Sequence, residues 1–159
     1  MTVEPEQSVL VVEDDVLVQE LLCVSLADAG FRLELAGNEQ QAVAALEAHR
    51  AQPLAGLVTD VNLGRGRTGW DIAQLAREFN PHLPVVYVSG DSAHAWAARG
   101  VPRSTMIPKP FVPAQIVMSA VQKAAQRDLD DIAAERDVIF ARPRHTDRVG
   151  VDLLVGGRP

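Results

Sequence analysis

Cysteine is almost absent from this chain of 159 residues, because Cys23 is the only one. A single cysteine excludes an internal disulfide and any metal cluster built on several thiolates. Its position is off the apolar stripe of the helix predicted around it, so we expect a partly exposed side chain. The four histidines are also few and scattered, and their positions match no metal-ligand spacing. We therefore expect them to be surface residues: His49, His82, His94 and His145.

Long apolar runs and an excess of basic residues are missing as well. No segment approaches the roughly 18 apolar residues that a membrane helix needs, and residues 1–9 lack the basic start and apolar stretch of a signal peptide. The net charge of −6 argues against a general nucleic-acid surface. The sequence therefore predicts a cytoplasmic protein with no membrane contact and no direct DNA binding. Its apolar and charged contents, 47% and 23%, are those of an ordinary globular chain.

Strand patterns and helix patterns alternate five times along the chain. Apolar, β-branched segments predict strands, and apolar residues at helical spacing predict a helix after each of them. Asp15 and Asn38 are suited to cap the first two helices. The predicted strands are 8–12, 31–36, 55–60, 84–90 and 104–108, and the predicted helices are 16–29, 39–50, 70–79, 92–100 and 113–126. This order predicts an α/β fold, a doubly wound parallel sheet with helices on both faces.

Reactive side chains stand where the predicted strands end. Glu13 and Asp14 follow the first strand, Asp60 ends the third, Ser89 ends the fourth, and Lys109 follows the fifth. In a doubly wound sheet these ends meet at one edge. Carboxylates brought together repel one another, which a hard cation such as Mg²⁺ relieves. An aspartate held by Mg²⁺ and a lysine can accept a phosphoryl group as an acyl phosphate. Each residue alone is compatible with a helix cap or a turn, but the ordered set favours a phosphoryl-transfer site.

The segments VLVVEDD, LVTDVNL, VVYVSGD and PKPF resemble, in order and spacing, the receiver domain of two-component response regulators. Over residues 5–127 the resemblance implies a five-stranded flavodoxin-like sheet in the order 2-1-3-4-5. It implies that a sensor histidine kinase or a histidine phosphotransfer protein phosphorylates Asp60. The implied metal ligands for Mg²⁺ are Glu13, Asp14, Asp60 and the main-chain carbonyl of Asn62. Ser89 would be the switch hydroxyl, and Lys109, before a cis bond to Pro110, would contact the phosphoryl group.

A competing motif lies directly after Asp60. Gly64, Gly66 and Gly69 have the GxGxxG spacing of a dinucleotide-binding loop. That loop normally follows the first strand of its unit, whereas these glycines follow the third, and a negative Asp60 would repel a pyrophosphate. We therefore interpret GRGRTG as a connecting loop and predict no bound nucleotide cofactor.

The same loop departs from the usual receiver pattern. Gly64 stands where the family usually has proline, and Gly69 comes one residue later than the usual glycine. We expect a longer and looser loop, with Arg65 and Arg67 near the mouth of the site.

Met106 takes the place, three residues before the lysine, of the aromatic that usually moves with the switch hydroxyl. Methionine is adaptable, so the switch signal could instead be carried by Tyr87 or Trp96, and Trp96 fits core packing and an interface equally well. Asp91, two residues beyond Ser89, is expected to tune the lifetime of the phosphoryl group.

The leading hypothesis is a stand-alone response regulator that is not an enzyme beyond its own phosphorylation and dephosphorylation. The alternative is a Mg²⁺-dependent phosphatase of the haloacid dehalogenase type. Such phosphatases need a second aspartate two residues after the nucleophile, where this chain has Asn62. A degenerate receiver that binds partners without phosphorylation is disfavoured by the intact Asp60 and Lys109.

Residues 128–159 are too few for a DNA-binding output domain, so we expect a partly helical tail. The fifth helix is predicted to continue to about Arg136, which leaves Leu129 and Ile132 without a core to cover them. A symmetric homodimer through the fourth helix, the fifth helix and the tail would cover them. The residues of the fifth helix expected to be buried are Val117, Ala120, Val121 and Ala124.

Overall fold

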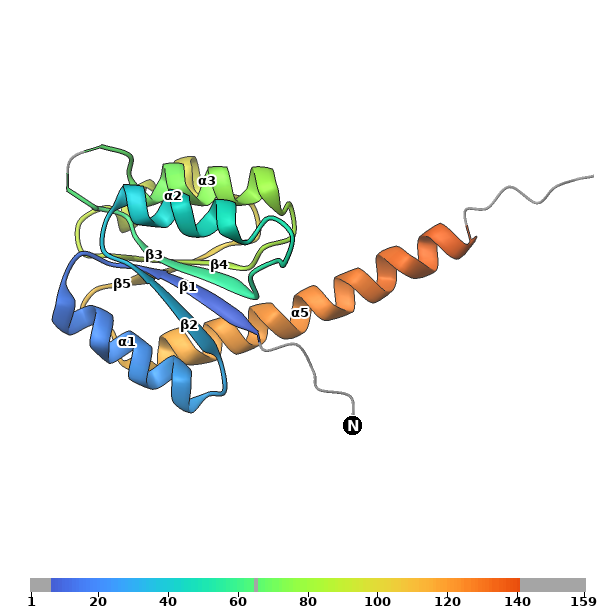
Figure 1. Ribbon diagram of the computed structural model, residues 1–159, viewed down its shortest axis with the longest axis horizontal. Helices are drawn as coiled ribbons and strands as arrows, with labels where there is room; N and C mark the ends of the chain where they lie inside the picture. The colour runs from blue at the N-terminus through green and yellow to red at the C-terminus, as the bar shows by residue number, and fades with distance from the viewer. Residues whose placement is uncertain (1–6, 65, 141–159) are drawn as a thin grey trace, which may run out of the picture.

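The structure, a computed structural model, describes residues 7–64 and 66–140, with side chains up to residue 133. Within these residues, strands and helices alternate as the sequence predicts (Figure 1). The strands are β1 (Ser8–Val12), β2 (Arg32–Ala36), β3 (Gly56–Asp60), β4 (Val85–Ser89) and β5 (Thr105–Pro108). The helices are α1 (Val16–Asp28), α2 (Glu39–Ala48), α3 (Gly69–Phe79), α4 (Trp96–Arg99) and α5 (Pro113–Phe140), with a 3₁₀ turn, η1 (Ala93–Ala95), directly before α4.

All neighbouring strands pair in parallel, in the order β2-β1-β3-β4-β5. Helices α2 and α3 cover one face of the sheet, and α1 and α5 cover the other (Figure 1). The doubly wound fold and its strand order are therefore confirmed. The register aligns Val12 with Thr59, Asp60 with Val88, and Ser89 with Pro108. This alignment brings the carboxyl ends of β1, β3, β4 and β5 to one edge.

Side-chain alternation along β1 divides the core into two layers. Leu10 and Val12 face the layer under α2 and α3, whereas Val9 and Val11 face the layer under α1 and α5. Because β1 is central, both of its faces are covered, which explains its uninterrupted β-branched sequence. The same holds for β3 and β4, whose residues are all buried. The carboxyl ends of these strands are thus held in a rigid frame.

Side-chain caps fix the starts of two helices, as predicted. The Asp15 carboxylate accepts the main-chain N–H groups of Leu17 and Val18, at 2.9 and 3.2 Å. Asn38 Oδ1 accepts the N–H of Gln41 at 2.9 Å. Each bond satisfies a donor that the first helical turn leaves free. The first cap fixes the start of α1 at Val16, so Glu13 and Asp14 lie in the short connection between β1 and α1.

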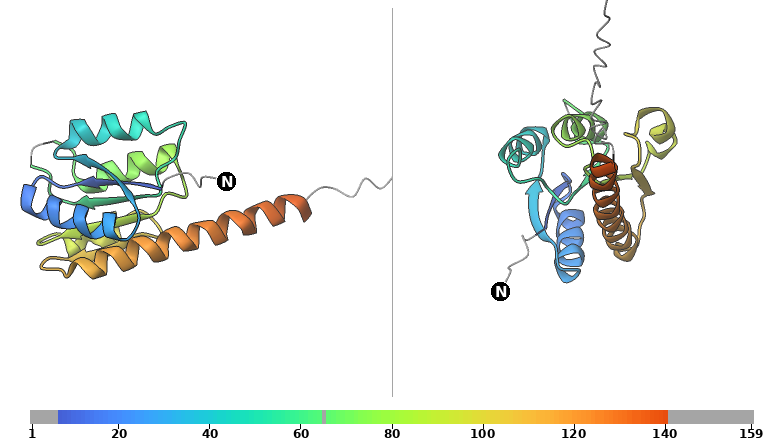
Figure 2. Two further views of the ribbon diagram at one scale, coloured as in Figure 1. Left: turned by 60° about the horizontal axis from the view of Figure 1, so that its bottom comes forward. Right: turned by 90° about the vertical axis from the view of Figure 1, so that its right-hand side faces the viewer.

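Helix α5 is continuous from Pro113 to Phe140 and so extends a turn beyond the predicted end at Arg136. Figure 2 shows its second half leaving the body of the protein. The predicted burial of Val121 is wrong, because 45% of its surface is exposed, and Ile116 is fully buried instead. Ile116 and Ala120 are one turn apart on the face toward the sheet, and Val121 follows a further 100° around the helix. No described helix is long and apolar enough to cross a membrane.

Candidate functional site

An acidic cluster lies at the edge where β1 and β3 end. Carboxylate oxygens of Glu13, Asp14 and Asp60 all lie within 4.8 Å of one another. Glu13 is 1% exposed and Asp60 is 6% exposed, whereas Asp14 is open to solvent. The structure therefore brings together the three acids that the sequence predicts to meet. Two of them are buried, so their mutual repulsion is only weakly screened by water.

Lys109 supplies the positive charge of this cluster. Its Nζ lies 3.1 Å from Asp60 Oδ2 and 3.4 Å from Glu13 Oε2. The main chain holds it in place, because the Lys109 N–H donates to the Ser89 carbonyl at 2.8 Å. The Lys109–Pro110 peptide bond is cis, as the resemblance implies. One lysine thus bridges two carboxylates and leaves the cluster with net negative charge.

Burial affects the pKa values of Glu13 and of the half-buried Lys109 in different ways. For Glu13, burial and the negative charge of Asp60 raise the pKa to about 7, although the N–H of Asp15 and the charge of Lys109 act against this rise. For Lys109, burial alone would lower the pKa. Its hydrogen bond to Asp60 and the charges of Asp60 and Glu13 outweigh burial, so the pKa of Lys109 is raised. Lys109 therefore stays protonated, while the negative charge of the Glu13 carboxylate is only partly balanced.

The donor set of this cluster suits a hard divalent cation. Among the described residues it consists of three carboxylates, with no histidine or cysteine, which is the chemistry that Mg²⁺ prefers. A dication would also relieve the repulsion that raises the pKa of Glu13. The acidic pocket of Glu13, Asp14 and Asp60 could therefore bind a metal ion.

The other predicted residues lie around this pocket. Ser89 is fully buried, and its Oγ accepts the N–H of Ser92 at 2.9 Å. The Asn62 N–H donates to Asp60 Oδ1 at 3.2 Å, and Asn62 Nδ2 lies 3.5 Å from Ser92 Oγ. Asp91 is exposed on the loop that follows β4. These contacts link the ends of β3 and β4 across the pocket.

The predicted switch residues occupy different environments. Met106 is half-buried on β5 and packs against the core under α2 and α3. Tyr87 is fully buried, packs on Trp70 with 4.6 Å between ring centroids, and accepts the N–H of Val101. Trp96 is 39% exposed, and its indole N–H donates to Ser104 at 2.9 Å. Tyr87 is thus fixed in the core, whereas Trp96 both packs and faces solvent.

The Arg67 end of the connection between β3 and α3 is tied to α2. Glu39, at the start of α2, accepts the Arg67 N–H at 2.9 Å and lies 3.3 Å from Arg67 Nε. The Arg67 side chain is therefore paired with α2, and Arg65 lies outside the described residues. In a nucleotide cradle such an amide would face phosphate, but here it faces a carboxylate. This contact favours the interpretation as a connecting loop.

Gly69 packs against the predicted acceptor residue, a contact that the sequence does not reveal, where this glycine is only displaced from its usual place. A Cβ atom built there would lie 2.0 Å from the carbonyl oxygen of Asp60 and 2.9 Å from Val61 Cα. The Gly69 N–H also donates to the Val61 carbonyl at 2.8 Å. The start of α3 therefore packs directly on the backbone of Asp60, and only glycine fits there.

Comparison with known proteins identifies the class. The sequence model of the response regulator receiver domain matches residues 9–121, so the chain belongs to this family. A response regulator receiver protein from Sinorhizobium medicae WSM419 has a similar crystal structure, with 32% identity and a TM-score of 0.73 over 77% of this chain and 97% of that one. No curated protein sequence matches the chain.

Two further structures are similar to this chain over the same unit. The receiver domain protein from Methanospirillum hungatei JF-1 has 17% identity and a TM-score of 0.68, over 79% of this chain and 99% of that one. NtrX from Brucella abortus has 25% identity and a TM-score of 0.68 over 82% of this chain but only 29% of its own. The unit thus also occurs as a part of a larger protein. None of these comparisons supports a haloacid dehalogenase.

Proposed function

We propose that Asp60 accepts a phosphoryl group from a sensor histidine kinase or a histidine phosphotransfer protein. The observation that carries this proposal is the position of Asp60, nearly buried at the end of β3, with Lys109 Nζ at 3.1 Å and two further acids around it. An Asp60 oxygen attacks phosphorus, a P–O bond forms, and the P–N bond to the partner's histidine breaks. Hydrolysis of the acyl phosphate restores the carboxylate.

The residues around Asp60 have distinct tasks in this proposal. Glu13, Asp14, Asp60 and the Asn62 main-chain carbonyl would hold Mg²⁺, which supplies the counter-charge for a dianionic phosphoryl group. Lys109 contacts a phosphoryl oxygen and holds Asp60 ready for attack.

Ser89 is proposed as the switch hydroxyl. Its present hydrogen bond comes from Ser92, so a move toward the phosphoryl group would release the loop that leads to α4. Met106, half-buried beside this region on β5, would follow the change.

A protein partner must reach Asp60, and exposed apolar side chains lie around the approach to this residue. Val16 and Leu17 at the start of α1 are 66% and 76% exposed, and Val112 before α5 is 62% exposed. Both helices begin at the edge that carries the acids. Exposed apolar groups around a charged site are typical of protein interaction surfaces, which favours a macromolecular phosphoryl donor over a small one.

Substitution of Asp60 tests the assignment. Asp60→Asn removes the attacking oxygen while keeping the size of the side chain, so label transfer from a phosphorylated kinase should be abolished. Asp28→Asn, at the exposed end of α1, serves as the control and should leave transfer unchanged. Excess EDTA should also stop transfer to the parent protein. Normal labelling of the Asp60→Asn protein would refute the acceptor, and undiminished transfer in EDTA would refute the metal.

We also propose that Asn62 and Asp91 set the lifetime of the phosphoryl group. Each follows a reactive residue by two positions, and both side chains are exposed where water would approach. Asn62→Ala and Asp91→Ala should change the dephosphorylation rate measured by loss of label, with no sign predicted for Asp91, since its charge can orient or repel water. Unchanged lifetimes in both variants would contradict this role.

Output is proposed to pass through a homodimer built on α5. Five exposed apolar residues recur along this helix at intervals of three or four, and they form what we call the α5 stripe. They are Met118, Val121, Ala125, Leu129 and Ile132. The stripe lies opposite the buried Ile116 and Ala120 and continues onto the part of α5 beyond the body, where a second copy can reach it (Figure 2). Stand-alone action, a domain boundary at residue 127 and a cytoplasmic location stay predictions.

A further inference from the structure

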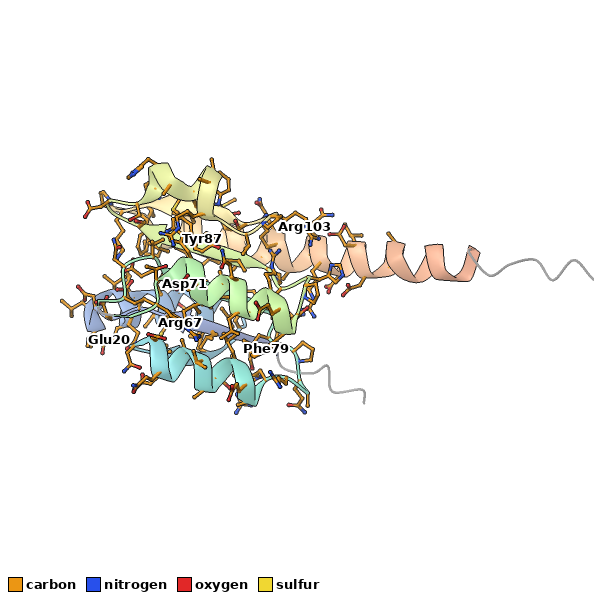
Figure 3. All side chains as sticks on the ribbon, turned by 90° about the horizontal axis from the view of Figure 1, so that it is seen from above. Glu20, Arg67, Asp71, Phe79, Tyr87 and Arg103 are labelled. Atoms are coloured by element: carbon orange, nitrogen blue, oxygen red, sulfur yellow. The ribbon has the colours of Figure 1, made fainter. Side chains whose placement is uncertain are left out.

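A basic cleft lies at the end of the molecule opposite the acidic cluster. It has a volume of about 350 Å³ and opens between the end of α3, the starts of β4 and β5, and the middle of α5. Figure 3 shows Arg103 beside α5, near the point where this helix leaves the body. We define the basic cleft by four cations, a histidine and one acid: Arg77, Arg103, Lys123, Arg127, His82 and Asp130. The whole chain carries a net charge of −6, so a group of four positive charges at one place contrasts with the acidic character of the chain.

Three of these cations have no carboxylate partner within the part of the chain that the structure describes. Arg77 donates to the carbonyls of Leu83 and Pro102, at 2.7 and 2.8 Å, and Lys123 donates to the carbonyl of Arg103 at 2.8 Å. Arg103 itself donates to the Pro81 carbonyl at 3.2 Å. These bonds position the cations, but a carbonyl does not neutralise their charge. Each group also keeps further N–H donors.

The fourth cation is only partly compensated. Arg127 donates to the Leu54 carbonyl at 2.9 Å, and its Nε lies 3.7 Å from Asp131. The backbone near it is unusual as well, since Arg103 has a φ of 59°, in the left-handed region that non-glycine residues rarely adopt. Arg103 thus stands in the turn before β5, with its guanidinium group on the Pro81 carbonyl and its own carbonyl on Lys123 of α5.

The cations disfavour one another in the absence of an anion. Burial and the charge of Arg103 lower the pKa of Arg77. Burial and the charges of Arg77 and Arg103 lower the pKa of Lys123. Holding like charges this close together is unfavourable in the free protein. A bound anion would attract all of them and so offset their mutual repulsion. The contacts to carbonyls alone would not require three cations at one place.

We propose that the basic cleft binds a small anion that carries at least two phosphate groups, such as a pyrophosphate or a nucleotide. Guanidinium groups bind phosphate oxygens in pairs, and a lysine adds a point charge. Asp130 lines the cleft and Asp131 lies beside Arg127, so two acids offset part of the four positive charges. Pyrophosphate can reach more of the remaining N–H donors than orthophosphate, because it carries more acceptor oxygens. The volume lies within the usual range for small-molecule sites. The ligand would join α3, the turn before β5 and α5 where the helix leaves the body.

Calorimetric titration of the full chain with inorganic pyrophosphate tests the proposal. Magnesium-free buffer with EDTA prevents binding through metal at the acidic cluster. Lys123→Gln and Arg103→Gln should each weaken pyrophosphate binding about tenfold, because each removes a charge-assisted bond. Arg99→Gln, an exposed cation on α4 outside the cleft, should bind like the parent protein. ATP should bind through the same residues, and orthophosphate should bind more weakly.

The titration also has outcomes that overturn the proposal. The proposal is wrong if the parent protein binds neither pyrophosphate nor ATP. It is also wrong if Arg99→Gln weakens pyrophosphate binding as much as the cleft variants do. A changed molecular mass of the Lys123→Gln protein, without anion binding by the parent, would assign the cleft to a protein contact instead. If a variant fails to fold, amide shifts of the parent protein decide. Pyrophosphate should shift Arg103 and Lys123, and shifts confined to Asp14 and Asp60 would contradict the site.

Discussion

Glu13 shows how a single residue can couple stability to the function of the site. Its carboxyl group is 1% exposed and lies beside Asp60 and Lys109. Burial of a carboxylate is unfavourable unless it is fully paired, and Lys109 is shared with Asp60. The folded protein therefore holds this group at a cost that a bound cation would offset. Such conflicts are concentrated at functional sites.

This conflict predicts a pH dependence of stability. The pKa of Glu13 rises from 4.5 to about 7 on folding, so the folded chain binds this proton more tightly than the unfolded chain. The resulting stabilisation is complete below pH 4.5 and is lost as the pH rises through 7, by up to about 1.4 kcal/mol per pH unit. In EDTA, Glu13→Gln should therefore gain stability relative to the parent protein between these two pH values, as measured by urea unfolding.

A control separates this effect from the general loss of a carboxylate. Glu20→Gln removes an exposed acid of α1, and its stability difference from the parent should stay nearly constant with pH. If Glu13→Gln and Glu20→Gln show the same pH dependence, the buried carboxyl is not the cause.

At the scale of elements, the contact between α3 and β3 constrains the acceptor. The first residue of α3, Gly69, leaves no room for a Cβ beside the backbone of Asp60 and Val61. Gly69→Ala should therefore displace this backbone and destabilise the protein by about 1–3 kcal/mol, as overpacking does. The rate of phosphoryl transfer to Asp60 should fall as well. Urea unfolding and the labelling assay measure the two effects.

Gly37→Ala is the matched control, since a Cβ there meets only the Gln41 side chain at an ordinary 3.6 Å. It should be close to neutral or slightly stabilising. Equal stability of the two alanine variants would show that the backbone near Asp60 adapts without cost.

Local sequence patterns predicted most helices and strands, because the apolar spacing of each segment matches the burial of that segment in the fold. The buried strands β1, β3 and β4 lie within a residue of their predicted ends, and Asp15 and Asn38 cap helices as expected. The acidic cluster was predictable too, since parallel strands bring their carboxyl ends together.

Contacts between segments far apart in the sequence were not predictable in this way. The bond between Glu39 and Arg67, and the fit of Gly69 against Asp60, depend on how α2, α3 and β3 approach one another. The basic cleft likewise gathers residues of α3, α5 and the turn before β5. Hydrophobic periodicity predicts which face of a helix is buried, but not which element covers that face. For Val121 even the predicted burial was wrong.

For the whole molecule, α5 connects two ends with different chemistry. The helix begins at the edge that carries Asp60 and Lys109, passes the basic cleft in its middle, and then leaves the body (Figure 1). The α5 stripe follows it from Met118 to Ile132. A second copy bound along the stripe would therefore be sensitive to changes at both ends of the sheet.

The predicted dimer depends on the part of the stripe beyond the body. Leu129 and Ile132 are 61% and 54% exposed, and full burial of each side chain contributes about 1.5–3 kcal/mol. Leu129→Ser with Ile132→Ser should therefore convert a dimer into a monomer in light scattering at micromolar concentration, while phosphoryl transfer to Asp60 continues. Val24→Ser, which alters a 62% exposed apolar residue on α1, should remain dimeric. A monomeric parent protein, with and without phosphorylation, would exclude this dimer, and a dimeric double variant would place the interface elsewhere.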